Sequence, residues 1–304
     1  MTLCKYIYSS LLGVVCTVGF LLVSCDSGDD INFGQSGGGQ VVNPGKNITS
    51  RMETPQVLTD GSTVLVSHFT TENNGREVMT YSLEYDRNKL HSRWIAFRFD
   101  GDTRAKNVSR SDEPFADDPQ LSSDLKIGSS GFGRTYNRGH LCASADRLYS
   151  REANNNTFYM SNMSPQLASF NQGYWITLEG VVQNLGRNAS FSDTLYVVKG
   201  GTIANHQVSN WVSRPNGKKV AVPKYYYMAL LKVKNNTYSS IAFWMEHKEY
   251  GYTYKKPAPK SVIKKHAVSV NRLEELTGIN FFPNLPAKQE ESIEDQLIPG
   301  NWGF

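Results

Sequence analysis

The sequence has little material for disulfide bonds, with four cysteines in 304 residues. Cys4 and Cys16 lie in an apolar N-terminal run that Cys25 closes, so only Cys142 belongs to the body of the chain. One cysteine cannot form an intramolecular bridge, which excludes a disulfide as support for the fold. We interpret Cys142 as a small buried hydrophobe. A catalytic thiol, two residues after His140, is the open alternative.

The sequence also lacks a strong charge of one sign. It has 32 Lys and Arg against 28 Asp and Glu, a formal net charge of +4. A dedicated nucleic-acid binder usually carries a larger and more clustered basic excess, so composition alone does not indicate a polyanion partner. Internal repeats are absent as well. The length allows a substantial core, and mixed strand and helix patterns continue without a break that would mark a second domain.

The N-terminal segment MTLCKYIYSSLLGVVCTVGFLLVSC has one lysine and then an apolar run, the pattern of an export signal. Its end resembles a bacterial lipobox, which predicts a signal peptide at residues 1–24 and lipidation of Cys25. Acyl chains contribute roughly 0.8 kcal/mol per buried methylene, so they would hold the protein on a membrane. We expect an exported lipoprotein of the outer membrane or cell surface. A simple secretory peptide or a single-pass anchor is the alternative.

The rest of the chain divides into three parts by composition. Residues 25–58 are rich in Gly, Ser, Asn and Asp and predict a flexible tether. Residues 59–286 predict the folded domain, and residues 287–304 predict a polar C-terminal tail. Within the domain, residues 101–135 show little regular pattern and are expected to be loop, where functional groups often lie.

Strands outnumber helices in the predicted domain, which indicates an α+β fold. RWIAFRFD, residues 93–100, alternates large apolar groups on one face. Three further aromatic and β-branched runs predict strands at residues 194–201, 224–233 and 239–246. Residues 172–185 have helical spacing. A second helix is expected between the cap Ser269 and the stop Gly278.

The helix at residues 172–185 contains a contradiction. Glu179 falls on its apolar face, four residues after Trp175, and an unpaired carboxylate there would cost several kcal/mol. Its partner must be an arginine, a hydrated metal or a buried donor. Asn171, near the helix start, either caps the helix or offers an amide oxygen of the kind that Mg2+ accepts.

The stretch TYNRGHLCASADR, residues 135–147, holds the other unusual group. His140 can accept a proton from water at neutral pH, and Arg138 offers a planar fork to phosphate oxygens. Gly139 between them would let the backbone turn tightly. A base, a phosphate-binding arginine and a Mg2+ ligand are the parts that phosphodiester hydrolysis needs.

Two motifs together resemble the DNA/RNA non-specific endonuclease family. They are NRGHLCASADR and, about twenty residues later, NMSPQLASFNQGYWITLE; VPKYYYMALLKV and LEELTGINFFPNLP extend the similarity over residues 60–286. The resemblance implies a ββα-metal (His-Me finger) nuclease fold, in which helices flank a central antiparallel sheet. It also implies hydrolysis of DNA and RNA that depends on Mg2+ (or Mn2+) and has little sequence preference.

The family motifs imply a role for each matching residue. His140 would be the general base, and Asn171 the only direct protein ligand of a single Mg2+. Glu179 would hold the water molecules around that ion, which resolves the contradiction of the buried carboxylate. Arg138 would contact phosphate, and Arg110, in VSRSDEPFADDP, would stabilise charge in the transition state.

Four further positions follow from the same resemblance. Asn162 and Gln166 match residues that brace the site by hydrogen bonds. Asn137 stands where the family has Asp, and Gln183 stands where the bacterial nucleases have Arg, one helical turn after the Glu. These two departures could weaken the hold on metal or substrate without removing the chemistry.

The leading hypothesis is therefore a lipid-anchored, Mg2+-dependent endonuclease that acts on DNA and RNA. A catalytically weak surface lipoprotein that binds nucleic acid or glycan is the alternative. A third interpretation is a phosphodiesterase for small or lipid substrates. The expected partners are DNA, RNA and the membrane that Cys25 reaches; the sequence indicates no protein partner.

Overall fold

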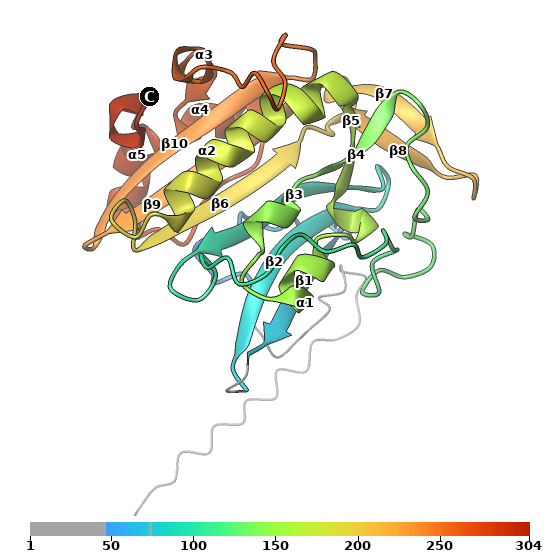
Figure 1. Ribbon diagram of the computed structural model, residues 1–304, viewed down its shortest axis with the longest axis horizontal. Coiled ribbons are helices and arrows are strands. Elements are labelled where there is room, and N and C mark those ends of the chain that lie inside the picture. The colour runs from blue at the N-terminus through green and yellow to red at the C-terminus, as the bar shows by residue number, and fades with distance from the viewer. Residues whose placement is uncertain (1–46, 73–74) are drawn as a thin grey trace, which may run out of the picture. The chain divides into compact units, whose positions relative to one another are not determined.

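A seven-stranded antiparallel sheet forms the centre of the protein (Figure 1). The computed structural model describes residues 47–72 and 75–304. The sheet has the order β1 (Thr63–Thr71), β2 (Glu77–Asp86), β3 (His91–Phe99), β6 (Thr194–Gly201), β9 (Tyr225–Lys234), β10 (Thr237–Glu246) and β11 (Ala267–Val268). Two two-stranded sheets lie outside it, β4 (Tyr136–His140) with β5 (Met163–Leu167) and β7 (Val208–Ser213) with β8 (Lys219–Pro223). The predicted α+β class and central antiparallel sheet are confirmed.

Helices cover both faces of this sheet (Figure 1). They are α1 (Arg151–Asn156), a π-helix (Phe170–Trp175) that runs into α2 (Ile176–Arg187), α3 (Lys260–Lys264), α4 (Val270–Thr277) and α5 (Ala287–Glu294). Short 3-10 turns occur at Ser144–Asp146, Met160–Asn162, Asn205–Gln207 and Pro299–Trp302. Ser269 caps α4 and Gly278 ends it in the left-handed conformation, as predicted. No helix in the described ranges has the length and apolarity needed to cross a bilayer.

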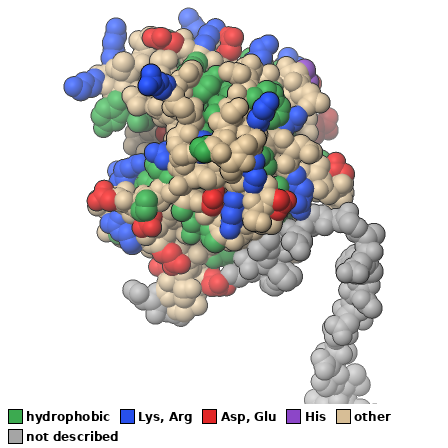
Figure 2. Space-filling view, turned by 90° about the vertical axis from the view of Figure 1, so that its right-hand side faces the viewer, with side chains coloured by type: hydrophobic (Ala, Val, Ile, Leu, Met, Phe, Trp, Pro, Cys, Tyr) green, Lys and Arg blue, Asp and Glu red, His purple; other side chains and the backbone are tan. Residues whose placement is uncertain are grey.

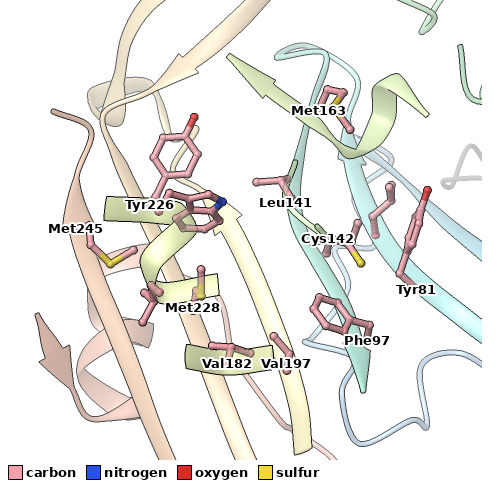
Figure 3. Packing of buried hydrophobic residues seen from close by; sticks show 14 of the residues in the cluster. Tyr81, Phe97, Leu141, Cys142, Met163, Val182, Val197, Tyr226, Met228 and Met245 are labelled. Atoms are coloured by element: carbon pink, nitrogen blue, oxygen red, sulfur yellow. The ribbon is translucent and has the colours of Figure 1, made fainter. Parts of the chain in front are cut away.

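The alternation in β3 separates two apolar cores. Ile95, Phe97 and Phe99 pack toward α2, and Trp94 and Ala96 pack toward α4 and α5. The first of these cores is shown in Figure 3, where side chains from the sheet, the β4–β5 region and α2 meet. Each fully buried apolar side chain contributes roughly 1.5–3 kcal/mol, so α2 is held firmly against the sheet.

The folded unit extends further at both ends than the sequence predicted. Ile48 and Thr54 are buried, and Asn284 donates hydrogen bonds to the carbonyl oxygens of Thr49 and Arg51. The predicted tether is therefore wrong over residues 47–58. The polar C-terminal tail is also wrong, because residues 287–294 form α5 and Trp302 is buried. The polar composition of these two segments gave no indication that they are folded, because each packs on the domain through only a few apolar side chains.

The predicted signal peptide, Cys25 and the first part of the tether lie outside the described residues. They remain predictions. The described part of the chain begins at residue 47, packed against the same domain.

Candidate active site

One pocket of about 430 Å³ is lined by most of the residues for which the sequence predicted a direct role in the reaction. Arg110, Arg138, His140, Asn171 and Glu179 all line it. They come from a loop, from β4, from the π-helix and from α2, so only the tertiary fold brings them together. The imidazole of His140 and the carboxamide of Asn171, which are some thirty positions apart in the chain, therefore line the same pocket.

His140 ends strand β4, and the backbone around it is tightly held. Its carbonyl oxygen accepts a hydrogen bond from the indole of Trp175 at 3.2 Å. The ring packs edge-on against Phe158, with 5.4 Å between centroids, and near Phe115, with 5.9 Å. Burial, reinforced by the positive charge of Arg110, lowers the pKa of His140 to about 3. The imidazole is thus neutral at neutral pH, the form that can accept a proton.

Asn171 lies in the π-helix, one residue after it begins at Phe170. It is not the cap, because the residue at the N-terminal boundary is Ser169. Its side chain makes no hydrogen bond to any residue that the structure describes, which leaves the amide oxygen available to the pocket. Wide π turns occur frequently at functional sites. Here the turn places an uncommitted amide in the pocket that the imidazole of His140 also lines.

Glu179 is buried on α2, and its partner is a lysine. The Nζ of Lys199 on β6 lies 3.9 Å from Glu179 Oε1 and 2.7 Å from Asp146 Oδ2. Burial raises the pKa of Glu179, and the ammonium of Lys199 opposes that rise. Oε1 nevertheless has no hydrogen-bond donor in the described chain. Pairing with an arginine, one of the expectations from sequence, is wrong.

Two arginines flank the imidazole on aromatic supports. The guanidinium of Arg138 lies 3.8 Å from the ring centre of Phe115, and it donates to Ser129 O at 2.8 Å. Arg110 lies 4.9 Å from the ring centre of Phe158 and is otherwise exposed. Both cations thus reach the pocket with ends that can bind phosphate oxygens.

Asn162 and Gln166 lie behind the site. Asn162 is fully buried; it accepts from Cys142 N and donates to Cys142 O and Thr157 O, which fixes the chain just after His140. Gln166 packs over Gly139, where an added Cβ would lie 2.1 Å from Gln166 Oε1. Gly139 therefore permits a close approach within a strand, and the tight turn expected there is wrong.

The two departures from the family pattern have different surroundings. Gln183 lines the pocket and donates to Asp146 Oδ1 at 3.0 Å, so it supports the carboxylate that holds Lys199. Asn137 pairs with Gln166 across the β4–β5 sheet and is partly buried. Neither position leaves an unpaired charge in the site.

The residues present fit a hydrated divalent cation. Asn171 has a free amide oxygen, and Glu179 has a buried carboxylate oxygen without a donor; both line one pocket. A site in which the protein supplies few oxygen ligands suits Mg2+, because this ion keeps most of its water shell. The described residues contain no group of three or more His, Cys, Asp or Glu side chains that could hold a metal.

Several residues of the candidate site were not predicted from the sequence. Lys199 and Asp146 are charged residues with no exposed surface, and Phe115 and Phe158 support the arginines. Tyr254 also lines the pocket. Asp146 belongs to the NRGHLCASADR motif, which could have identified it. No sequence pattern marks the other four residues.

Comparison with known proteins agrees with this geometry. A family model described as DNA/RNA non-specific endonuclease matches residues 60–288. Nuclease C1 of Cunninghamella echinulata var. echinulata is 27% identical over 215 residues, which cover 68% of this chain and 81% of that protein. Human mitochondrial endonuclease G is 26% identical over 223 residues, 69% of each chain. Mouse mitochondrial nuclease EXOG is 26% identical over 231 residues, 71% of this chain but only 58% of that protein.

A solved structure supports the fold. The crystal structure titled as the EndoG/EndoGI complex, on the mechanism of EndoG inhibition, matches with a TM-score of 0.56 and 24% identity. The match covers 74% of this chain and 89% of that one. The predicted ββα-metal nuclease fold is confirmed.

Proposed function

The chain belongs to the DNA/RNA non-specific endonuclease family, and from this premise we propose that it is a Mg2+-dependent nuclease that cleaves both DNA and RNA. The observation that carries the proposal is the shared pocket of His140, Asn171 and Glu179. Binding alone needs no neutral, unbonded imidazole beside an uncommitted amide. The curated relatives are themselves named nucleases.

His140 acts as the general base in the proposed reaction. Its neutral ring takes a proton from the attacking water, whose oxygen then bonds to phosphorus while the bond to the leaving oxygen breaks. Arg138 and Arg110 bind the phosphate oxygens on which charge increases. Asn171 and Glu179 would hold Mg2+ or Mn2+, which would supply Lewis-acid stabilisation of the leaving group.

Substrate contacts in this proposal go mainly to phosphate and sugar. Such contacts position a nucleic acid without reading its sequence. Lys and Arg side chains are interspersed with Asp and Glu on the face drawn in Figure 2, rather than gathered in one basic field. With a net charge of only +4, the hold on the strand depends on the few cations at the pocket.

The predicted location completes the proposal. Lipidation of Cys25 would place the nuclease at the outer membrane or cell surface, where it meets extracellular nucleic acid. Labelling of growing cells with a radioactive fatty acid tests this part separately. Label should enter the wild-type protein and be lost in Cys25→Ala.

A plasmid-nicking assay tests the chemistry. With Mg2+ the wild type should nick DNA, and EDTA should abolish the activity. His140→Ala should lose at least about a hundredfold in rate while it remains folded, because a positioned base contributes roughly 10²–10⁴. Asn171→Ala should need more Mg2+ and also run slower. His206→Ala is the matched control, since His206 is exposed and outside the pocket.

Four outcomes would reject the mechanism. One is nicking that persists in EDTA, and another is full activity in His140→Ala. The third is a wild type that cleaves a mononucleotide diester but no polymer, which would support the small-substrate phosphodiesterase instead. A wild type that binds DNA without cutting it would support the binding lipoprotein.

A further inference from the structure

The segment between β10 and α3 is pinned to the helix that carries Asn171 (Figure 1). An added Cβ on Gly173 would lie 2.4 Å from the carbonyl oxygen of Tyr252, so only glycine allows this approach. One helical turn later, Ala258 N donates to Thr177 Oγ1 at 3.4 Å. Both sides of the loop are therefore fixed relative to the pocket.

Between these anchors the loop makes a tight turn that projects an aromatic ring. Thr253 and Lys256 exchange two backbone hydrogen bonds of 3.0 Å, which leaves Tyr254 and Lys255 at the tip. The side chain of Tyr254 is 75% exposed. It makes no hydrogen bond or ring contact with the part of the chain that the structure describes. Single exposed aromatics are common, so its exposure alone would indicate nothing.

The position of Tyr254 is what distinguishes it. It lines the catalytic pocket, and it also lines a second hollow of about 500 Å³. Gln172, the neighbour of Asn171, is the other residue that the two spaces share. A strand that is bound beside His140 and runs past Tyr254 would therefore enter the second hollow.

The lining of the second hollow suits a base better than a phosphate. Tyr254 and Tyr252 offer ring surface, and the carboxylate of Glu249 repels phosphate while it can accept from the amino group of a base. Lys255, at the rim, offers a cation to the backbone that leaves the hollow. Stacking of bases on aromatic side chains tolerates every base, because each has a π face.

We propose that the hollow beside the catalytic pocket is a subsite for one unpaired nucleobase of the substrate, stacked on Tyr254, with Lys255 at its phosphate. This inference rests on the proposed nuclease function and specifies its substrate. A base can stack there only when it has left its own helix. The enzyme therefore favours single-stranded or frayed DNA and RNA over intact duplex, without a preference for one base.

A binding cycle in the His140→Ala background tests the subsite without cleavage. The probes are a fluorescent DNA single strand and the same backbone with abasic sugars. Loss of a stacked base costs roughly 1–3 kcal/mol, so Tyr254→Ala should weaken binding of the normal strand by about tenfold. The same change should leave binding of the abasic strand unaltered. In the same background, Tyr254→Phe should leave binding of both strands unchanged. Trp211→Ala is the matched control, because Trp211 is an exposed aromatic residue outside both spaces.

Cleavage by the otherwise wild-type enzyme separates this inference from the proposed function. Tyr254→Ala should reduce kcat/KM about tenfold on single strands and much less on duplex. If the wild type shows no Mg2+-dependent cleavage at all, the proposed function fails. If it cleaves but Tyr254→Ala equals the wild type on both substrates, or weakens normal and abasic strands equally, only the stacking subsite fails. Equal weakening of the normal and abasic strands would make Tyr254 a general surface contact.

Discussion

At the residue scale, the active site is organised around one buried cation. Lys199 has no exposed surface, and its ammonium lies between the carboxylates of Asp146 and Glu179. Asp146 in turn accepts from Gln183 and from the backbone of Ala143. This network connects the loop after His140 with α2 and β6. Its charges are held apart from water, so the loss of one member leaves the others uncompensated.

Lys199→Met should therefore destabilise the protein strongly. Removal of one partner of a buried ion pair typically costs about 3–5 kcal/mol, because the remaining carboxyl groups are left buried without their cation. Urea unfolding of the variant measures this loss. Lys234→Met, which breaks the exposed pair with Asp193, should cost less than about 1 kcal/mol. Equal losses in the two variants would show that the buried network does not hold the fold.

Cys142 is a packing residue of the apolar core. It is fully buried in the core shown in Figure 3, and burial raises the pKa of its thiol above the ordinary value. Cys142→Ser should lower the free energy of unfolding by about 1–3 kcal/mol, because it buries a hydroxyl among apolar groups. Below its unfolding temperature the variant should keep the wild-type nicking rate. Loss of cleavage in a fully folded variant would restore the thiol nucleophile.

At the scale of the element, the helix from Phe170 to Arg187 does most to shape the site. Its π-helical start carries Asn171, and its α-helical part carries Glu179 on the face that packs on the sheet. Gly173 and Gly180 both lie within it, and they differ in surroundings. Gly173 meets the carbonyl of Tyr252, whereas a Cβ on Gly180 would meet no heavy atom within 4 Å.

The two glycines should consequently respond to alanine with opposite signs. Gly173→Ala forces the loop away from the helix and should cost about 1–3 kcal/mol, as overpacked sites do. Gly180→Ala should stabilise the protein by roughly 0.5–1 kcal/mol, since alanine restricts the unfolded chain and favours the helix. Thermal unfolding at constant pH compares them. The same sign of change in both variants would contradict the close approach of Tyr252.

At the scale of the whole molecule, buried titratable groups make stability depend on pH from both sides. His91 and His247 are neutral and hydrogen-bonded, and burial lowers the pKa of each to about 4. Between pH 4 and 6.5 the unfolded state binds more protons at these histidines, so their contribution falls as pH falls. Burial raises the pKa of Glu274 to about 7 and that of Glu294 to about 8. At these two glutamates the folded state binds more protons than the unfolded state above pH 4.5. The free energy of unfolding therefore falls as pH rises.

These opposing effects predict greatest stability between about pH 4.5 and 6.5, where they offset each other. Above pH 6.5 the carboxyl groups with raised pKa values contribute, Glu179 among them, and we expect a decline on the order of 1 kcal/mol by pH 8 after allowance for solvent screening. Urea unfolding in EDTA at pH 6 and pH 8 measures it. Glu294→Gln should lose less stability over that interval. An identical decline in wild type and variant would show that the docked C-terminal segment is not its source.

The sequence by itself determined the features that depend on neighbours a few positions apart. Alternation divided β3 between two cores, Ser269 and Gly278 bounded α4, and the two motifs identified His140 and Asn171. These features follow from side-chain period and local hydrogen bonds, which a linear pattern contains.

Only the tertiary structure decided what packs against those features. Lys199 lies 53 positions from Asp146, and Asn284 lies 235 positions from Thr49. Whether such residues meet depends on strand order and on which face each helix covers. The partner of Glu179, the docked chain ends and the place of Tyr254 were therefore unreadable in the sequence, because each is a contact whose energy arises only when distant segments are brought together.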